Sequence, residues 1–124
     1  MRPHEKLEVW KRAIEFVITV YKRTSDFPKE EKFGLTSQIR RAAVSVPTNI
    51  AEGAARQSPR EFCRFLAMAQ GSASELETEL LISERLGYLA VDIHTEMHDE
   101  LNTIARMIVG LSQHQKRKAT GEKM

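Results

Sequence analysis

The sequence predicts an all-α fold, an up-down-up-down antiparallel four-helix bundle. Apolar residues recur at spacings of three and four through segments of similar length, as amphipathic helices require. These segments are residues 5–24, 30–52, 59–86 and 92–115. Connections of roughly five residues are typical of antiparallel neighbours in a bundle. We therefore expect one bundle domain over residues 1–115, followed by a flexible basic tail over residues 116–124.

The first predicted helix has two neighbouring apolar stripes. One is Leu7, Trp10, Ile14, Val17, Ile18 and Tyr21, and the other is Val9, Ala13, Phe16 and Val20. Pro28 prevents the helix from continuing into the next segment.

The second predicted helix contains a proline, Pro47, which a helix interior normally rejects because it lacks an N–H. The apolar pattern resumes at Ile50, so we expect a kink rather than an end. Gly53 is expected to end the helix as a left-handed C-cap. The predicted core stripe is Leu35, Ile39, Ala42, Ala43, Val46 and Ile50, with a polar stripe of Arg41, Ser45, Thr48 and Glu52.

The third predicted helix has the strongest start signal in the chain, an N-cap Ser58 followed by Pro59 and by Glu61 of a capping box. Small residues around Gly71 in its middle would let another helix approach closely. The fourth predicted helix has a bundle seam with spacings of four and three. The seam is Met97, Leu101, Ile104, Ile108 and Leu111.

Charge is unevenly distributed although the net charge is only +2. Residues 1–64 hold 13 Lys and Arg against 8 Asp and Glu, whereas residues 65–115 hold 2 against 8. This polarity fits nucleic-acid contact, head-to-tail pairing of subunits, or solvated helix faces that differ in sign. A single cysteine, Cys63, and an N-terminus without a signal-peptide apolar stretch predict a cytoplasmic protein. No apolar run is long enough to span a membrane.

Several segments together resemble the bacterial four-helix-bundle family of 23S rRNA intervening-sequence proteins. The strongest match is residues 38–53, QIRRAAVSVPTNIAEG. Residues 58–62 (SPREF), 71–79 (GSASELETE), 7–10 (LEVW) and 87–89 (GYL) also match, so the resemblance covers about residues 5–112.

The resemblance implies a ring-forming homopentamer of four-helix bundles without established enzymatic activity. The family is also similar to the accessory variability proteins of diversity-generating retroelements, which form basic pentamers that engage nucleic acid. This chain differs from those relatives in being nearly charge-balanced.

Catalytic, metal and cofactor sites are not predicted. His94 and His98 lie four residues apart, but a two-histidine site lacks ligands and Glu96 is misplaced for a metalloprotease motif. Glutamates at 75, 77, 79 and 84 form an acidic flank whose simplest interpretation is a solvated or subunit-contacting face. No phosphate loop, serine elbow or dinucleotide fingerprint is present, so we expect no enzyme.

Two kinds of binding residue are predicted. Arginines near the junction of the second and third helices could hold phosphates, or could pair with carboxylates. They are Arg40, Arg41, Arg56, Arg60 and Arg64. Apolar residues beyond one stripe per helix predict a contact between subunits. Its candidate residues are Val44, Pro47, Ala51, Phe62, Phe65 and Gly71.

The sequence leaves two functional hypotheses. The first is a non-enzymatic homo-oligomer, a pentamer by the resemblance, that binds structured RNA or DNA. The second is a protein-binding oligomeric scaffold with no nucleic-acid role. Neither hypothesis requires a cofactor or a membrane.

Overall fold

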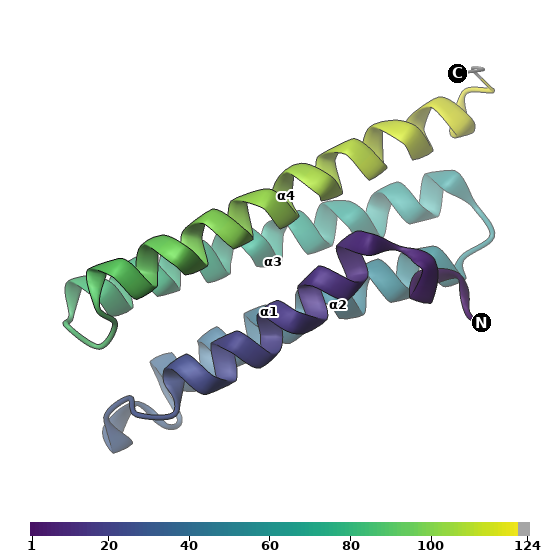
Figure 1. Ribbon diagram of the computed structural model, residues 1–124. Coiled ribbons are helices and arrows are strands. Elements are labelled where there is room, and N and C mark those ends of the chain that lie inside the picture. Colours follow the sequence, from purple (N-terminus) through teal and green to yellow (C-terminus); the bar gives the residue numbers. More distant parts are fainter. Residues whose placement is uncertain (122–124) are drawn as a thin grey trace.

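Four α-helices lie side by side and alternate in direction, which confirms the predicted antiparallel four-helix bundle (Figure 1). The computed structural model describes residues 1–121, and no strand occurs among them. The helices are α1 (Glu8–Thr24), α2 (Leu35–Ala55), α3 (Pro59–Arg85) and α4 (Val91–Ala119). Short 3-10 helices η1 (Pro3–Lys6) and η2 (Lys29–Glu31) precede α1 and α2.

The first two helices begin later than the sequence predicted. Leu7 has an extended backbone (φ −85°, ψ 122°), so η1 is separate from α1. Gly34 (φ −109°, ψ −115°) likewise separates η2 from α2. A carboxylate oxygen of Glu31 accepts a hydrogen bond from the Leu35 N–H at 3.2 Å, which satisfies one unpaired donor of the first turn of α2.

The predicted end of α2 at Gly53 is wrong, because the helix continues to Ala55. Gly53 has no positive φ and is buried. A Cβ atom there would lie 2.8 Å from both Phe62 Cδ1 and Phe65 Cβ. The glycine therefore permits close packing of α2 on α3 rather than a left-handed turn. As expected, α2 runs through Pro47 without interruption; the kink stays a prediction.

The start of α3 is as predicted, since the Ser58 hydroxyl accepts a hydrogen bond from the Glu61 N–H at 3.2 Å. The fourth helix continues to Ala119, beyond the predicted boundary at residue 115. The segment expected to be a flexible tail thus begins as helix. Residues 122–124 of that segment lie outside the described residues.

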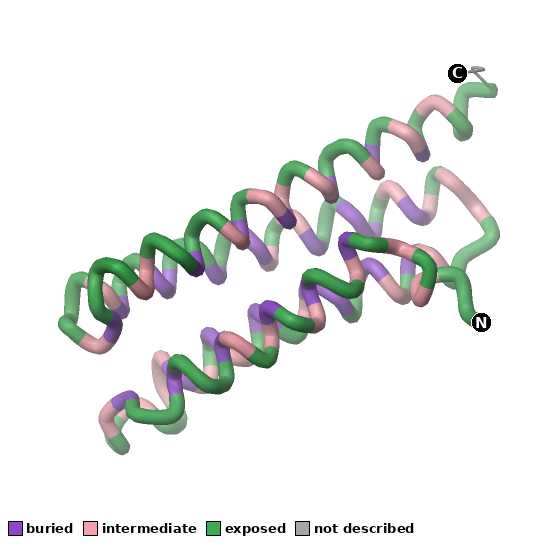
Figure 2. Tube along the Cα trace, viewed as in Figure 1, coloured by how far each residue is buried: buried purple, intermediate pink, exposed green. Residues whose placement is uncertain are grey.

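The core runs along the full length of the bundle, and Figure 2 shows buried positions recurring along the inner side of each helix. From α1 it takes the stripe of Val9, Ala13, Phe16 and Val20. The other α1 stripe stays partly exposed, with Ile18 at 45% and Tyr21 at 42%. From the other helices it takes, among others, Ile39, Ile50, Leu66, Leu76, Leu101 and Ile108.

The connections at each end of the bundle determine which segments are neighbours. The α1–α2 and α3–α4 connections share one end, where Tyr88 donates a hydrogen bond to Glu31 at 3.1 Å and packs against Phe27. The N-terminus, the α2–α3 connection and the C-terminal end of α4 share the opposite end (Figure 1). Within residues 1–121, no helix is long and apolar enough to cross a membrane.

Candidate functional site

The five arginines predicted from the sequence do not form one cluster. Arg41 and Arg56 are separated by fifteen residues, which corresponds to about 20 Å along α2. Arg56, Arg60 and Arg64 surround the α2–α3 connection, whereas Arg40 and Arg41 lie towards the other end of the bundle. The two groups are therefore separate candidate sites.

The first group belongs to an end of the molecule that is rich in cations. Arg60 is exposed on the first turn of α3, and the Arg56 guanidinium lies 5.0 Å from the centroid of the Phe65 ring. Arg64 lies 5.8 Å from the same ring and pairs with Glu61 at 3.5 Å. Basic residues in the last turn of α4 are Lys116, Arg117 and Lys118. We call Arg56, Arg60, Arg64, Lys116 and Lys118 the basic end.

A small hollow opens at the basic end, with a volume of about 290 Å³. Residues from three helices and a connection line it: Ala54, Arg56, Gln57, Ser58, Pro59, Phe62, Gln115 and Lys118. The first N–H groups of α3 lie here, and a helix N-terminus favours anions. Cationic side chains from two separate segments and a helix N-terminus therefore meet at one place.

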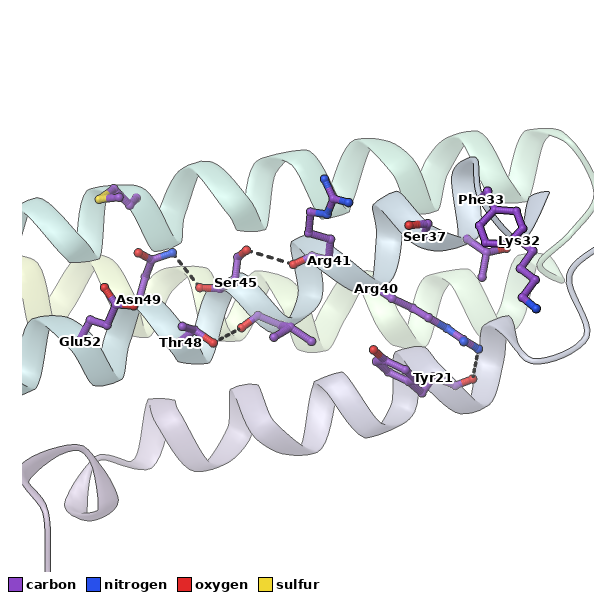
Figure 3. Close-up of a pocket in the computed structure, with 13 residues that line it drawn as sticks. Tyr21, Lys32, Phe33, Ser37, Arg40, Arg41, Ser45, Thr48, Asn49 and Glu52 are labelled. Atoms are coloured by element: carbon purple, nitrogen blue, oxygen red, sulfur yellow. Dashed lines mark hydrogen bonds between the residues drawn. The ribbon is translucent and has the colours of Figure 1, made fainter.

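Arg40 and Arg41 point in opposite directions despite being adjacent (Figure 3). Arg40 points towards α1, where it donates hydrogen bonds to the Thr24 hydroxyl at 3.0 Å and the Tyr21 carbonyl at 3.2 Å. Its guanidinium also lies 4.4 Å from the centroid of the Tyr21 ring. Arg41 points towards α3, is exposed, and forms no ion pair among residues 1–121. Arg40 thus holds two helices together, whereas Arg41 is available to a ligand.

A larger hollow, of about 750 Å³, follows the outer face of α2 on the side of α3. We call it the α2–α3 groove. It is lined by Tyr21, Lys32, Phe33, Thr36, Ser37, Arg40, Arg41, Val44, Ser45, Thr48, Asn49, Glu52 and Met68. Figure 3 shows its polar side chains arranged along α2, with Phe33 and Lys32 at one end and Glu52 at the other.

Three polar side chains of this groove bond back to their own helix. Ser45 donates to the Arg41 carbonyl at 3.0 Å, Thr48 to the Val44 carbonyl at 2.8 Å, and Asn49 to the Ser45 carbonyl at 2.8 Å. These bonds satisfy the donors locally and leave acceptor oxygens for a ligand. The hydroxyl oxygen of Thr36 is buried and has no hydrogen-bond partner within the described residues.

The candidate subunit-contact residues occupy different environments. Val44 is 40% exposed, Ala51 is half-buried and Pro47 is buried in the protomer. All three line a second groove of about 360 Å³, which we call the α1–α2 groove. Its other lining residues are His4, Trp10, Ile14, Val17, Thr48 and Glu52.

The remaining contact candidates lie on α3. Phe62 (8% exposed) and Phe65 (5% exposed) are buried within the protomer, so a partner subunit could reach little of either side chain. Gly71 is exposed, and no atom lies within 4 Å of where its Cβ would be. Gly71 therefore stays available for a close approach.

Metal-binding geometry is absent from residues 1–121, where no three His, Cys, Asp or Glu side chains group together. The His94 and His98 rings lie 6.0 Å apart on α4. Cys63 is half-buried, and its thiol contacts the Ser112 carbonyl at 3.6 Å. Of the acidic flank on α3, Glu75 and Glu77 are exposed but Glu79 is only 7% exposed.

The family of the chain follows from its sequence. The family model described as 23S rRNA-intervening sequence protein matches residues 5–110. The chain belongs to this family. The resemblance of residues 38–53 and the other motifs is thereby confirmed.

The fold of this member of the 23S rRNA-intervening sequence proteins has a solved counterpart. It is similar to a protein with unknown function from the S23 ribosomal protein family of Bacteroides thetaiotaomicron, with a TM-score of 0.75 and 23% identity. The similarity covers 84% of this chain and 97% of that chain. At this identity the likeness shows the shared fold. A comparison with curated proteins gives no match.

Sequence reasoning missed the aromatic residues beside Arg40 and Arg41. Tyr21 was assigned to an apolar stripe, and Phe33 was not singled out within the segment predicted as helix. The available signal was Gly34 directly after Phe33, because glycine next to a short connection favours a turn. A turn exposes a side chain that a helix stripe would bury, and Phe33 is 89% exposed.

Proposed function

We propose that this 23S rRNA-intervening sequence protein is a non-enzymatic homo-oligomer that binds structured RNA, or another nucleic acid, through its basic end. The observation that supports this most directly is the convergence of Arg56, Arg60 and Lys118 around the N-terminus of α3. Arg56 and Arg60 flank the α2–α3 connection, whereas Lys118 comes from the end of α4, far away in the sequence.

The chemistry of the basic end suits a phosphate backbone. Arginine presents planar donors that match phosphate oxygens, and the α3 N-terminus adds a positive partial charge. Arg56 rests on the Phe65 ring, which limits its motion and so reduces the entropy lost on binding. These contacts read charge and shape, so we expect weak sequence preference.

Fluorescence anisotropy against structured 23S rRNA fragments and control duplexes, across a salt series, tests the proposal. We expect binding that weakens linearly with the logarithm of salt concentration, because phosphate contacts release counterions. Replacing Arg56 and Arg60 together by alanine removes two such contacts. We expect the salt slope to fall by about 2 and the affinity at low salt to fall at least roughly tenfold.

A matched control removes two arginines from elsewhere. Arg85 and Arg106 are exposed and lie away from the basic end. Their double alanine variant loses the same net charge, so it should retain most of the affinity if location matters. Equal losses in the two double variants would contradict a site at the basic end.

The alternative, a protein-binding scaffold, has its own supporting observation. Apolar side chains on the outer side of α1 and α2, including Ile18, Tyr21 and Val44, are 40% or more exposed. No RNA binding even at low salt would favour this alternative, as would a partner retained at high salt and after nuclease treatment.

Self-association is the part of the proposal that the α1–α2 groove supports. Trp10, Ile14 and Val17 of α1 face Val44 and Pro47 of α2 across this groove. A monomer gains nothing from a continuous apolar strip on its surface, whereas a second copy would remove it from water. Contacts that close on themselves form rings.

A further inference from the structure

Phe33 is the most unusual surface residue of the protein. It is 89% exposed, on the turn between η2 and α2, and its ring contributes nothing to the core. The ammonium group of Lys32 lies 5.4 Å from its centroid. An isolated exposed aromatic ring of this kind is rare in a bundle, because burial of a phenylalanine side chain is worth about 1.5–3 kcal/mol.

Cationic side chains line the end of the α2–α3 groove that carries Phe33. Lys32, Arg40 and Arg41 all line this end, and Figure 3 shows them together with Tyr21. The one carboxylate of the lining, Glu52, lies eleven residues beyond Arg41, about 16 Å along α2.

Of the two acidic side chains of η2, Glu30 is exposed and Glu31 already has partners. Its carboxylate accepts hydrogen bonds from the Leu35 N–H and from the Tyr88 hydroxyl. The Glu31 carboxylate therefore competes only weakly with an anionic ligand for Arg41. The Phe33 end of the groove thus combines positive charge with two exposed aromatic rings.

A site that combines cationic side chains with aromatic rings favours anions that have flat, apolar faces. Every nucleic-acid base has such a face, but in a duplex the faces are covered by neighbouring bases. Proteins that hold single strands combine a cationic groove with aromatic platforms for this reason. Further along the groove, the Ser45 hydroxyl and the Asn49 amide oxygen can accept hydrogen bonds from N–H donors of other bases of the same strand.

We infer that the Phe33 end of the α2–α3 groove binds unpaired nucleotides, with a base stacked on Phe33 and the backbone phosphates at Lys32 and Arg41. This inference rests on the nucleic-acid binding proposed above and adds a second site at the opposite end of the bundle from the basic end. Together the two sites select an RNA that carries a single-stranded segment next to a duplex.

The experiment compares a 12-nucleotide oligouridylate with a 12-base-pair RNA duplex, each fluorescently labelled, by anisotropy against the full chain. The variants are Phe33→Ala, Phe33→Tyr and Arg41→Ala. Val91→Ala is the matched control, because Val91 is apolar and 67% exposed at the start of α4 but does not line the groove.

We expect Phe33→Ala to weaken oligouridylate binding roughly tenfold and to leave duplex binding unchanged. Phe33→Tyr keeps an aromatic face and should retain most of the affinity. Arg41→Ala should lower the salt slope for oligouridylate by about 1. Val91→Ala should leave the affinity for both ligands unchanged. Circular dichroism establishes that each variant is folded.

Unchanged oligouridylate affinity in Phe33→Ala would overturn the inference, and the basic end could still bind duplex RNA through Arg56 and Arg60. A fall in mass by light scattering in Phe33→Ala would also overturn it, because the groove would then be a contact between subunits. If Phe33→Ala weakened oligouridylate binding but the Arg56 and Arg60 double alanine variant bound RNA as the wild type does, the basic end would no longer be a candidate binding site. If neither set of variants changed the affinity, both assigned sites would be wrong, and absence of wild-type binding to both ligands at low salt would remove nucleic-acid binding altogether.

Discussion

At the scale of single residues, Glu79 is the group least suited to its surroundings. It is a carboxyl group that is 7% exposed on α3, and its Oε1 atom is buried without a hydrogen-bond partner in the described part of the chain. Burial, together with the charge of Glu75 one turn earlier, raises the pKa of Glu79 to about 7. The folded protein therefore holds a proton that the unfolded chain releases near its ordinary pKa of 4.5.

This difference makes stability depend on pH. Between about pH 4.5 and pH 7 the folded state binds more protons than the unfolded state, so the free energy of unfolding falls as the pH rises. The full effect is at most about 3 kcal/mol at 1.36 kcal/mol per pKa unit. The Glu79→Gln variant has no titrating group at this position, so it does not lose this stability as the pH rises. We expect the variant to match the wild type below about pH 4.5 and to exceed its stability at pH 8, measured by urea denaturation.

Glu77→Gln provides the control, because Glu77 is exposed two residues earlier on the same helix. Its stability should follow the wild type across the pH range. Parallel curves for Glu79→Gln and the wild type would show that Glu79 is charged in the folded state at pH 7.

At the scale of helices, the packing of α2 against α3 depends on Gly53. The Phe65 Cβ atom that would clash with a new Cβ is attached to the α3 backbone, so it cannot rotate away. Relief would require the two helices to separate at their connected end. Gly53 therefore sets the distance between these helices beside the basic end.

Gly53→Ala should destabilise the protein even though alanine favours helix. Alanine gains about 1 kcal/mol of helix propensity, and overpacking of a tight contact costs about 1–3 kcal/mol or more. We expect a net loss in thermal denaturation. Gly110→Ala in α4 is the control, since its Cβ would meet nothing within 4 Å, and it should gain up to about 1 kcal/mol. Equal gains in both variants would contradict the tight contact.

Gly53 also illustrates what local sequence patterns can establish. The periodicity predicted four helices and their order correctly, because each helix must bury one stripe. It could not distinguish a glycine that ends a helix from one that lets a second helix approach. That difference depends on Phe62 and Phe65, which belong to another helix. The beginning of α3 was predictable because Ser58 and Glu61 act within one turn.

At the scale of the whole molecule, the basic end and the exposed apolar side chains of α1 and α2 occupy different parts of the surface. Chain folding brings the N-terminus, the α2–α3 connection and the end of α4 together, so the basic end forms from segments that the sequence keeps apart (Figure 1). The sequence predicted arginines with phosphate-binding potential but placed them in one cluster. Their division into two sites follows from the length of α2, and the role of Arg40 follows from its contacts with α1.

Self-association involves the whole molecule, and a substitution at Val44 tests it. Val44 is 40% exposed and lines the α1–α2 groove, whereas Val109 is 41% exposed on α4 and lies outside it. Five protomers of 14.2 kDa would give a mass of about 71 kDa by light scattering. We expect Val44→Glu to lower the mass, because a buried unpaired carboxylate is costly at an interface. Val109→Glu introduces the same charge at the same exposure and should leave the mass unchanged.

The outcomes distinguish three arrangements of the molecule. A wild-type mass near 14.2 kDa at micromolar concentration would exclude the homo-oligomer. A fall in mass with Val109→Glu alone would move the contact to the α3–α4 side. A fall with Val44→Glu alone would place the contact at the α1–α2 face, and the basic end would then be repeated around the assembly. Repetition matters for RNA binding, because several weak phosphate sites on one particle act at high effective concentration and bind more tightly than any single site.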